Sequence, residues 1–391
     1  MLIGRRRWLR TAAVVMVVGA GLVWLAAPYV RSLAFIIDVS GREVAFRRWL
    51  PVAVLPVDHE DITVPTRRGG VTGRLYRPHD ARASGRTVLV VPGLHSAGVE
   101  DPRLERLSMR LAGTGTTVLT LPLPDLRRFV VTAQSTDVIE DAAGWLAMQP
   151  SLTPSGRISL IGISFGGGLS LVAAGRPALS GKLDMVVSFG GHGDLPRVLR
   201  YMSTGLLPDG TRQPAHDYGP VIFLFNALPH LVPAEQVAPL DRAIRVFLDA
   251  SMVDASEPGR ATALFRQAHD LGVALPEPAR TIMADVSTRD ATRLGPRLLA
   301  LTEQVAGNPV VSPERSPATL APVFLVHGSE DTVIPQTETP SLAAFYDRAP
   351  GRNGMKTEWL ITPAVSHADA RAVAGLNDLW KIVRFWTKIF D

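Results

Sequence analysis

The chain has 391 residues, of which 46% are hydrophobic and 20% are charged. This composition excludes a disordered chain, and the length suits about two to three domains or one large α/β domain with an insertion. The chain contains no cysteine, which excludes disulfides, a thiol nucleophile, an iron–sulfur cluster and a cysteine-ligated zinc site.

The formal net charge of +5 originates in the N-terminal segment. Residues 1–50 contain eight arginines and two acidic residues, which leaves 33 basic and 34 acidic side chains in the rest of the chain. A basic arm on a nearly neutral body provides no basic stripe for nucleic acid. We therefore expect that the chain binds no nucleic acid and that its basic N-terminal segment lies at a membrane.

Residues 11–30 form a run of twenty uncharged residues, and four arginines lie directly before it (Arg5, Arg6, Arg7 and Arg10). This length is sufficient for a helix to cross the hydrocarbon core of a bilayer. The positive-inside rule places residues 1–10 in the cytoplasm and the body on the extracytoplasmic side. We therefore expect a single-pass signal anchor at residues 11–30.

Two other interpretations of this segment stay open. A cleaved signal peptide would release the body as a secreted protein, although the pair Ala26–Ala27 lacks a small residue at the −3 position. A buried core helix is the other alternative, and the preceding arginines speak against it.

After a connector at residues 31–59, short apolar runs alternate with helical patterns over residues 60–194. A hairpin is predicted at residues 61–66 and 71–76, because Arg-Arg-Gly-Gly separates two alternating segments. Strands are then predicted at residues 87–91, 116–121, 157–163 and 183–189, with helices at 102–112 and 135–148 between them. The expected fold class is α/β, with a mostly parallel central sheet and helices on both faces.

Residues 195–320 interrupt this alternation and are predicted to be a helical insertion. One helix is expected around residues 237–248, and Ser287 to Asp290 resembles a capping box that opens a second helix through Val305. The alternation resumes over residues 321–391, with strands at 322–327 and 357–362 and a closing helix at 379–389.

A nucleophilic serine is predicted in the sequence Gly162-Ile163-Ser164-Phe165-Gly166. A serine hydroxyl stands clear of a sheet when a sharp strand-to-helix turn holds it, and glycines two residues away on both sides prevent collisions across that turn. The strand before Ser164 and the small-residue helix after it provide this context.

A serine nucleophile needs a base, and the base needs a carboxylate that orients it. Asp331 and His367 each follow a predicted strand, and the carboxyl ends of parallel strands meet at one edge of a sheet. Asp194, which follows an earlier strand, is an alternative acid, and Glu330 is a neighbouring one. Three other histidines, His95, His192 and His327, are expected to have structural roles.

The order Ser164, Asp331, His367 resembles the α/β-hydrolase fold, over roughly residues 60–194 and 320–391, with the insertion in the position of a cap. The resemblance implies Ser164 as nucleophile, His367 as general base and acid, and Asp331 as the orienting acid. It also implies an oxyanion hole from the N–H groups of Phe165 and Leu94. Pro92 stands where the family usually has histidine, so that the second donor is either Leu94 or His95.

These features predict a membrane-anchored serine hydrolase that cleaves carboxylic esters or thioesters through an acyl-enzyme intermediate. A lipophilic substrate would suit an anchored enzyme with an apolar cap. The alternatives are a non-catalytic binding or scaffold protein on the same fold, and a peptidase or acyltransferase. The expected chemistry needs no cofactor or metal, and the sequence leaves the oligomeric state open.

Overall fold

One eight-stranded sheet forms the centre of the molecule. The computed structural model describes residues 21, 23–79, 85–216, 218–254, 257–288, 291–365 and 375–390, and the structural statements below concern these residues. The strands are β1 (Val57–Thr66), β2 (Gly69–Pro78), β3 (Thr87–Val91), β4 (Thr117–Thr120), β5 (Ile158–Ile163), β6 (Leu183–Phe189), β7 (Val323–Gly328) and β8 (Glu358–Thr362). Their spatial order is β1-β2-β4-β3-β5-β6-β7-β8.

The sheet is parallel except at one edge. The predicted hairpin is present as β1 and β2, which pair antiparallel to each other, and β2 also pairs antiparallel to β4. The remaining strands pair in parallel. This arrangement confirms the predicted fold class, and it places the carboxyl ends of β5, β7 and β8 at the same edge of the sheet.

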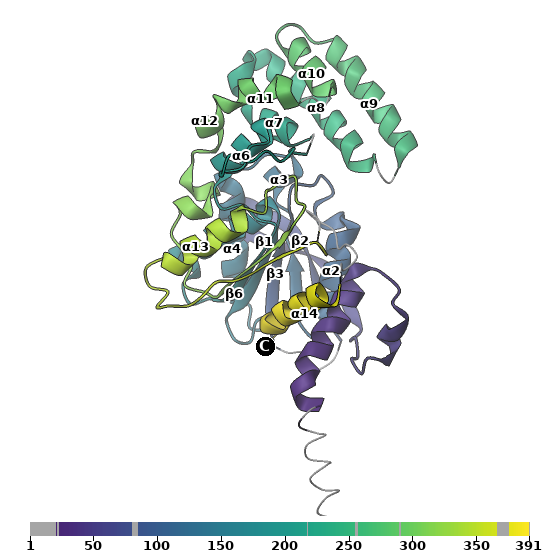
Figure 1. Cartoon of the computed structure of the whole chain (residues 1–391), viewed down its shortest axis with the longest axis vertical. Helices are drawn as coiled ribbons and strands as arrows, with labels where there is room; N and C mark the ends of the chain where they lie inside the picture. Colours follow the sequence, from purple (N-terminus) through teal and green to yellow (C-terminus); the bar gives the residue numbers. More distant parts are fainter. Residues whose placement is uncertain are drawn as a thin grey trace, which may run out of the picture.

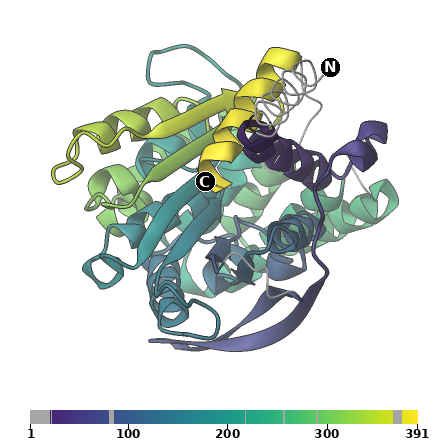
Figure 2. The ribbon, with the colours of Figure 1, turned by 90° about the horizontal axis from the view of Figure 1, so that it is seen from below.

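Helices cover both faces of the sheet (Figures 1 and 2). Apolar residues of α4, α5 and α13 pack on one face, and those of α2, α14 and the N-terminal helix pack on the other. The core helices are α2 (Pro102–Gly113), α3 (Pro124–Arg127), α4 (Ala133–Ala147), α5 (Phe165–Ala174), α13 (Glu338–Arg348) and α14 (Leu376–Phe390). Short 3-10 turns are η1 (Ala45–Trp49), η2 (Gly98–Glu100), η3 (Pro177–Leu179), η4 (Pro309–Val311) and η5 (Pro313–Arg315).

A set of helices, here called the cap, lies between β6 and β7 and above the carboxyl end of the sheet (Figure 1). It consists of α6 (Leu195–Thr204), α7 (Gly219–Leu231), α8 (Ala234–Val253), α9 (Pro258–Val273), α10 (Ala279–Ser287), α11 (Ala291–Leu299) and α12 (Thr302–Ala306). The apolar run of α7 is buried and packs in the same core cluster as the other cap helices and the sheet. Its side chains therefore stabilise the cap itself.

The predicted capping box in the cap is wrong. Ser287 is the last residue of α10, and its hydroxyl donates a hydrogen bond of 2.9 Å to the carbonyl of Met283. A serine that bonds back to the preceding turn satisfies its hydroxyl locally and does not open a new helix. The next helix begins at Ala291, and Val305 belongs to the separate helix α12.

The N-terminal helix continues well into the predicted connector. A helix from Val23 to Ser40 is long and apolar enough to cross a membrane by length and composition. Its second half is buried, since Ser32, Ala34 and Phe35 are each less than 5% exposed. Residues 1–20 and Leu22, which include eleven of the twenty residues of the predicted membrane span, lie outside the described residues.

Candidate active site

Ser164 occupies a sharp turn between β5 and α5. Its backbone has φ 55° and ψ −131°, a conformation that non-glycine residues rarely adopt. Two hydrogen bonds hold this conformation: the Ser164 amide donates to the Phe189 carbonyl at 2.7 Å, and the Gly167 amide donates to the Ser164 carbonyl at 2.8 Å. The strain is the one that a nucleophile elbow requires, and Ser164 is 4% exposed beneath the cap.

The glycines around Ser164 are required by close backbone contacts. A Cβ atom on Gly162 would collide with the backbone of Gly166 and Gly167, and one on Gly166 would collide with the carbonyl group of Pro92. The first contact lies within the elbow, and the second joins the elbow to the loop after β3. Close contacts with neighbouring backbone atoms therefore explain the glycines at both positions.

The loop after β3 passes directly over Ser164. A Cβ atom on Gly93 would lie 2.8 Å from the Cβ and 3.4 Å from the Oγ of Ser164. Leu94 follows at once, and Phe165 provides the first amide of α5, where helix N–H groups have no partner within the helix. Among the described residues, neither the Leu94 nor the Phe165 amide donates a backbone hydrogen bond. The arrangement is suitable for an oxyanion hole formed by the amides of Leu94 and Phe165, and this assignment stays a prediction.

The side chain of His95 is engaged within its own loop. Its Nδ1 accepts a hydrogen bond of 3.1 Å from the Ala97 amide, and its Nε2 lies 3.7 Å from a carboxylate oxygen of Asp101. Burial lowers the pKa of His95, partly offset by Asp101. The imidazole therefore shapes the loop, which agrees with the structural role expected for it.

Asp331 lies in the loop after β7 and is buried. Its Oδ1 accepts hydrogen bonds from the amides of Val333 at 2.9 Å and Ile334 at 3.0 Å. Two backbone donors on one oxygen fix the plane of the carboxylate and stabilise its negative charge. Burial, with a smaller contribution from the Asp331 charge, raises the pKa of Tyr201 to about 12.

His367 lies outside the described residues, which end at Val365 in this part of the chain. The strand that leads toward it is described. β8 pairs with β7 so that Thr362 is opposite Gly328, and the Ser329 amide donates to the Thr362 carbonyl at 3.0 Å. The segment toward His367 and the loop of Asp331 therefore leave the sheet from neighbouring strand ends.

The two alternative acids have different surroundings. Asp194 is the N-cap of α6: its Oδ1 accepts from the Arg197 amide at 2.8 Å, and its Oδ2 accepts from Nε of Arg315 at 2.6 Å. Both of its oxygens are thus used by the helix and by an ion pair. Glu330 is exposed, whereas its neighbour Asp331 is buried. These contacts favour Asp331, and the assignment stays a prediction.

Two buried histidines form hydrogen bonds near the predicted site residues. His192 donates from Nε2 to the Val311 carbonyl at 2.7 Å and packs against the ring of Phe165. Its burial lowers its pKa, which keeps the ring neutral. His327 donates from Nε2 to the Ile334 carbonyl at 2.9 Å and accepts at Nδ1 from the Thr339 hydroxyl. It thereby holds the loop that carries Asp331.

The cap lies against the loop of Asp331 and the loop after β3 through residues that the sequence analysis does not single out. The side chain of Gln213 donates to the Asp331 carbonyl at 2.9 Å. Asp249 on α8 faces Ser96, in the loop that follows Leu94, and burial raises the pKa of Asp249, partly offset by Ser96. Neither residue belongs to a motif or an apolar period, so no sequence signal marks them.

A buried ion-pair cluster joins the cap to the core. Arg197 on α6 donates from Nε to Oε1 of Glu338 at 2.6 Å and from Nη2 to Glu314 at 2.7 Å. Glu338 is fully buried and also accepts from the Gly193 amide at 2.8 Å. Because Glu338 begins α13 of the core, this cluster fixes the base of the cap relative to the sheet.

We expect Glu338→Gln to destabilise the protein by about 3 kcal/mol, because the change removes the buried charge that Nε of Arg197 pairs with and leaves Arg197 only its pair with Glu314. The free energy of unfolding in urea measures the effect. The control is Glu257→Gln, which breaks an exposed pair with Arg260 at 3.3 Å and is expected to cost less than about 0.5 kcal/mol. Equal losses in the two variants would contradict a structural role for the cluster.

We expect Gly93→Ala to lower kcat/KM for ester hydrolysis by about 100-fold, because the added Cβ displaces the loop from Ser164. Far-ultraviolet circular dichroism is expected to stay unchanged. Gly259→Ala is the matched control, since no atom lies within 4 Å of a Cβ at that position. Full activity of Gly93→Ala would show that this loop does not shape the site.

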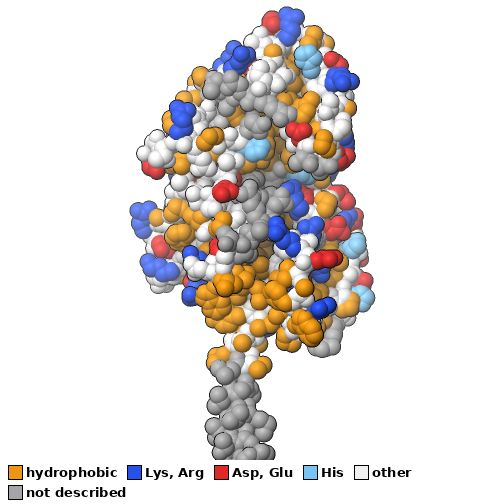
Figure 3. Space-filling model, turned by 45° about the vertical axis from the view of Figure 1, so that its right-hand side comes forward, with side chains coloured by type: hydrophobic (Ala, Val, Ile, Leu, Met, Phe, Trp, Pro, Cys, Tyr) orange, Lys and Arg blue, Asp and Glu red, His pale blue; other side chains and the backbone are white. Residues whose placement is uncertain are grey.

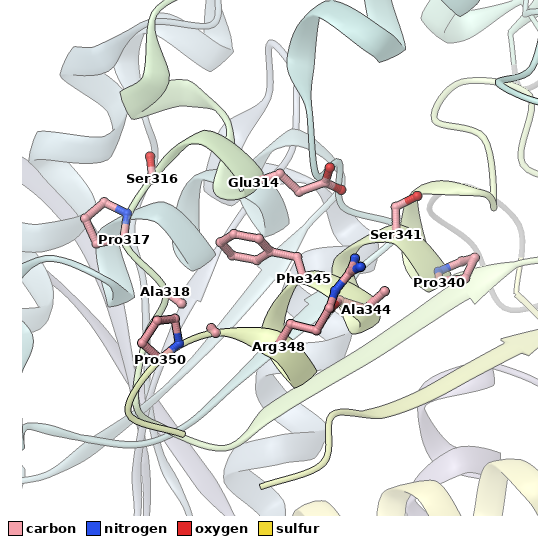
Figure 4. Close-up of a pocket in the computed structure, with 11 residues that line it drawn as sticks. Glu314, Ser316, Pro317, Ala318, Pro340, Ser341, Ala344, Phe345, Arg348 and Pro350 are labelled. Atoms are coloured by element: carbon pink, nitrogen blue, oxygen red, sulfur yellow. The ribbon is translucent and has the colours of Figure 1, made fainter. Parts of the chain in front are cut away.

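A surface pocket of about 820 Å³ lies apart from these residues, between α13 and the segment after η5. Figure 4 shows Phe345 on α13 pointing toward the segment that contains Ser316 and Pro317. None of the predicted site residues lines this pocket. In the described part of the chain, no group of three or more histidine or acidic side chains is arranged to hold a metal ion.

Comparisons with known proteins find likeness only among solved structures. No protein-family model matches the chain, and no curated protein sequence matches it. An esterase from Pyrobaculum calidifontis is 17% identical, with 94% of this chain and 90% of that chain covered and a TM-score of 0.45. A dienelactone hydrolase from Anabaena variabilis is 16% identical, with coverages of 85% and 97% and a TM-score of 0.41. An esterase from Pyrococcus furiosus is 13% identical, with coverages of 86% and 98% and a TM-score of 0.45. The α/β-hydrolase fold of this chain rests on its own sheet order and on the elbow at Ser164.

Proposed function

We propose that the chain is a membrane-anchored serine hydrolase that cleaves carboxylic esters, with Ser164 as nucleophile, His367 as general base and acid, and Asp331 as the orienting acid. The observation that carries the proposal is the backbone of Ser164, since a buried serine at φ 55° between a strand and a helix is the arrangement of a nucleophile elbow. The fixed carboxylate of Asp331 supports it.

The reaction proceeds in two halves. Oγ of Ser164 attacks the ester carbonyl carbon while His367 takes the hydroxyl proton, and the tetrahedral intermediate places its oxyanion at the amides of Leu94 and Phe165. His367 then gives the proton to the leaving alcohol as the carbon–oxygen bond breaks. A water molecule attacks the acyl-enzyme in the same way, His367 returns the proton to Ser164, and the carboxylic acid leaves.

The N-terminal helix supports the anchoring part of the proposal. Val23, Trp24 and Leu25 are largely exposed, which suits a helix that passes into lipid rather than one that packs in a core. The preceding arginines favour a cytoplasmic N-terminus, with the catalytic body on the extracytoplasmic side. Under the alternative of signal-peptide cleavage, the same body would be secreted.

The test of the catalytic proposal is hydrolysis of p-nitrophenyl esters by the full-length chain and by His367→Ala. We expect a burst of p-nitrophenol equal to the enzyme concentration, because p-nitrophenol is a good leaving group and the acyl-enzyme forms faster than water hydrolyses it. His367→Ala is expected to lose at least about 10³-fold in kcat. His327→Gln is no suitable control because that side chain holds the Asp331 loop, so His230→Ala in the cap, where the ring contacts Gln304 at the surface, serves instead. Equal activity of His367→Ala and the wild type would contradict the mechanism.

A further inference from the structure

The N-terminal helix is joined to the body without a flexible linker. Val23, Trp24 and Leu25 are at least 60% exposed, whereas Phe35, two to three turns further along the same helix, is buried. An unbroken helix transmits its direction over its whole length. The axis of the helix at Val23, Trp24 and Leu25 is therefore fixed relative to the sheet.

Contacts with α14 hold the helix in this orientation. Phe35 packs on the ring of Trp386 with centroids 4.7 Å apart, and the hydroxyl of Thr387 donates to that of Ser32 at 2.9 Å. Closer to the exposed end, Tyr29 stacks on Trp380 at 5.2 Å. Because α14 also packs on the sheet, the helix, α14 and the sheet form one rigid unit.

Exposed aromatic side chains lie on the N-terminal helix, on the η1 turn and on α14. We call this set the aromatic base; it comprises Trp24, Tyr29, Phe46, Trp49 and Trp380. Trp24 and Trp49 are each 76% exposed. The η1 turn that carries Phe46 and Trp49 is tied to the helix by a bidentate pair between Arg47 and Asp38. Figure 3 shows hydrophobic side chains gathered around the exit of the helix, and Figure 2 views this end of the molecule from below.

The same surface carries an excess of positive charge. Residues 21–54 and 376–390 together contain seven basic and three acidic side chains. Arg48 lies over the ring of Trp49 at 5.4 Å, whereas Lys388 is paired with Glu358 of β8. Exposed tryptophan and tyrosine with nearby cations are typical of surfaces that contact the headgroups of an anionic bilayer. A soluble surface would rarely expose so many large rings together.

We propose that the aromatic base rests in the headgroup region of the bilayer that holds the N-terminal anchor, and that the catalytic end of the sheet faces away from that bilayer. The inference rests on the anchoring part of the proposed function. Its occupant is the lipid surface itself, because the anchor helix passes through the middle of the patch and brings the bilayer to it.

The orientation determines how substrate arrives. Ser164 and Asp331 follow the carboxyl ends of β5 and β7, and the cap lies over that end through contacts such as that of Gln213 with Asp331. Figure 1 shows the cap at one end of the molecule and the N-terminal helix leaving from the other. Substrate therefore reaches the site from the aqueous side of the molecule, away from the anchoring bilayer.

The absence of cysteine makes a direct test possible, since each introduced cysteine is the only one in the chain. Full-length Trp49→Cys and Val273→Cys carry a nitroxide label and are reconstituted into vesicles of phosphatidylcholine and phosphatidylglycerol. Position 49 is in the aromatic base, and position 273 is an exposed site at the end of α9 in the cap. Collision rates with oxygen, which concentrates in lipid, and with a water-soluble nickel complex report the surroundings of each label. We expect a high oxygen-to-nickel ratio at position 49 and a low one at position 273.

The outcomes separate this inference from the anchoring on which it rests. Flotation of the same vesicles in a density gradient reports anchoring on its own, and ester hydrolysis reports that the body is folded. If the chain floats but position 49 is as accessible to nickel as position 273, the aromatic base does not contact lipid and the inference is overturned. Protection of position 49 from both reagents would indicate a protein partner and would also overturn it. Failure to float would remove the anchoring and the inference together, while leaving the catalytic proposal in place.

Discussion

Ser164→Ala is expected to abolish ester hydrolysis, with a loss in kcat of about 10⁵-fold or more, while the protein stays folded. The hydroxyl is the atom that forms the acyl-enzyme, and no other described group can replace it at the elbow. Alanine keeps the Cβ atom and the backbone, which the bonds to the Phe189 carbonyl and from the Gly167 amide hold in place. Initial rates with p-nitrophenyl acetate and a thermal melt measure the two effects.

The matched control is Ser170→Ala, one and a half turns further along α5. The Ser170 hydroxyl is buried and has no hydrogen-bond partner among the described residues, so its removal is expected to leave stability equal or slightly higher and activity unchanged. Comparable losses in both variants would mean that α5 tolerates no substitution. Substantial turnover by a folded Ser164→Ala variant would remove the serine mechanism.

Asp331→Asn is expected to lower kcat by about 10⁴-fold. The amides of Val333 and Ile334 both donate to Oδ1, so an asparagine at this position places its carbonyl oxygen there. Its NH₂ group then occupies the position of Oδ2 and presents a donor where the proposed mechanism requires an acceptor for the imidazole of His367. The histidine is left in the wrong tautomer to accept the proton of Ser164. Steady-state kinetics between pH 6 and 9 measure the loss.

Asp194→Asn distinguishes the two acids. Asparagine is also a good N-cap residue, so we expect activity close to the wild type and a stability loss of about 1 kcal/mol from the weakened pair with Arg315. A 10⁴-fold loss in Asp194→Asn with an active Asp331→Asn would transfer the role of the acid to Asp194.

Patterns that are local in the chain predict the fold well. The strand at residues 87–91 is present with the same bounds, and the helix predicted at 379–389 is α14, longer by a few residues at its start. These elements are predictable because apolar residues recur every two residues in a half-buried strand and every 3.6 residues in an amphipathic helix. The serine elbow is predictable for a similar reason, because its strand, glycines and helix are adjacent in the sequence.

Contacts between distant segments are not predictable from such patterns. The sequence contains no sign that residues 31–40 extend a membrane helix onto α14, or that Gln213 of the cap bonds to the Asp331 loop. The capping box at Ser287 fails because the hydroxyl finds a carbonyl in its own helix. In each case a tertiary hydrogen bond or a competing local one determines the structure. The partner in such a bond does not recur at a fixed spacing in the sequence, so that a pattern in one sequence does not identify it.

We propose that Ser164 is an activated nucleophile, and the intact mass of the detergent-solubilised chain after treatment with a fluorophosphonate tests this. We expect one adduct on the wild type and none on Ser164→Ala, because only a serine with a general base reacts readily with such a probe. No adduct on folded, wild-type protein would contradict the claim, as would an adduct that persists in Ser164→Ala.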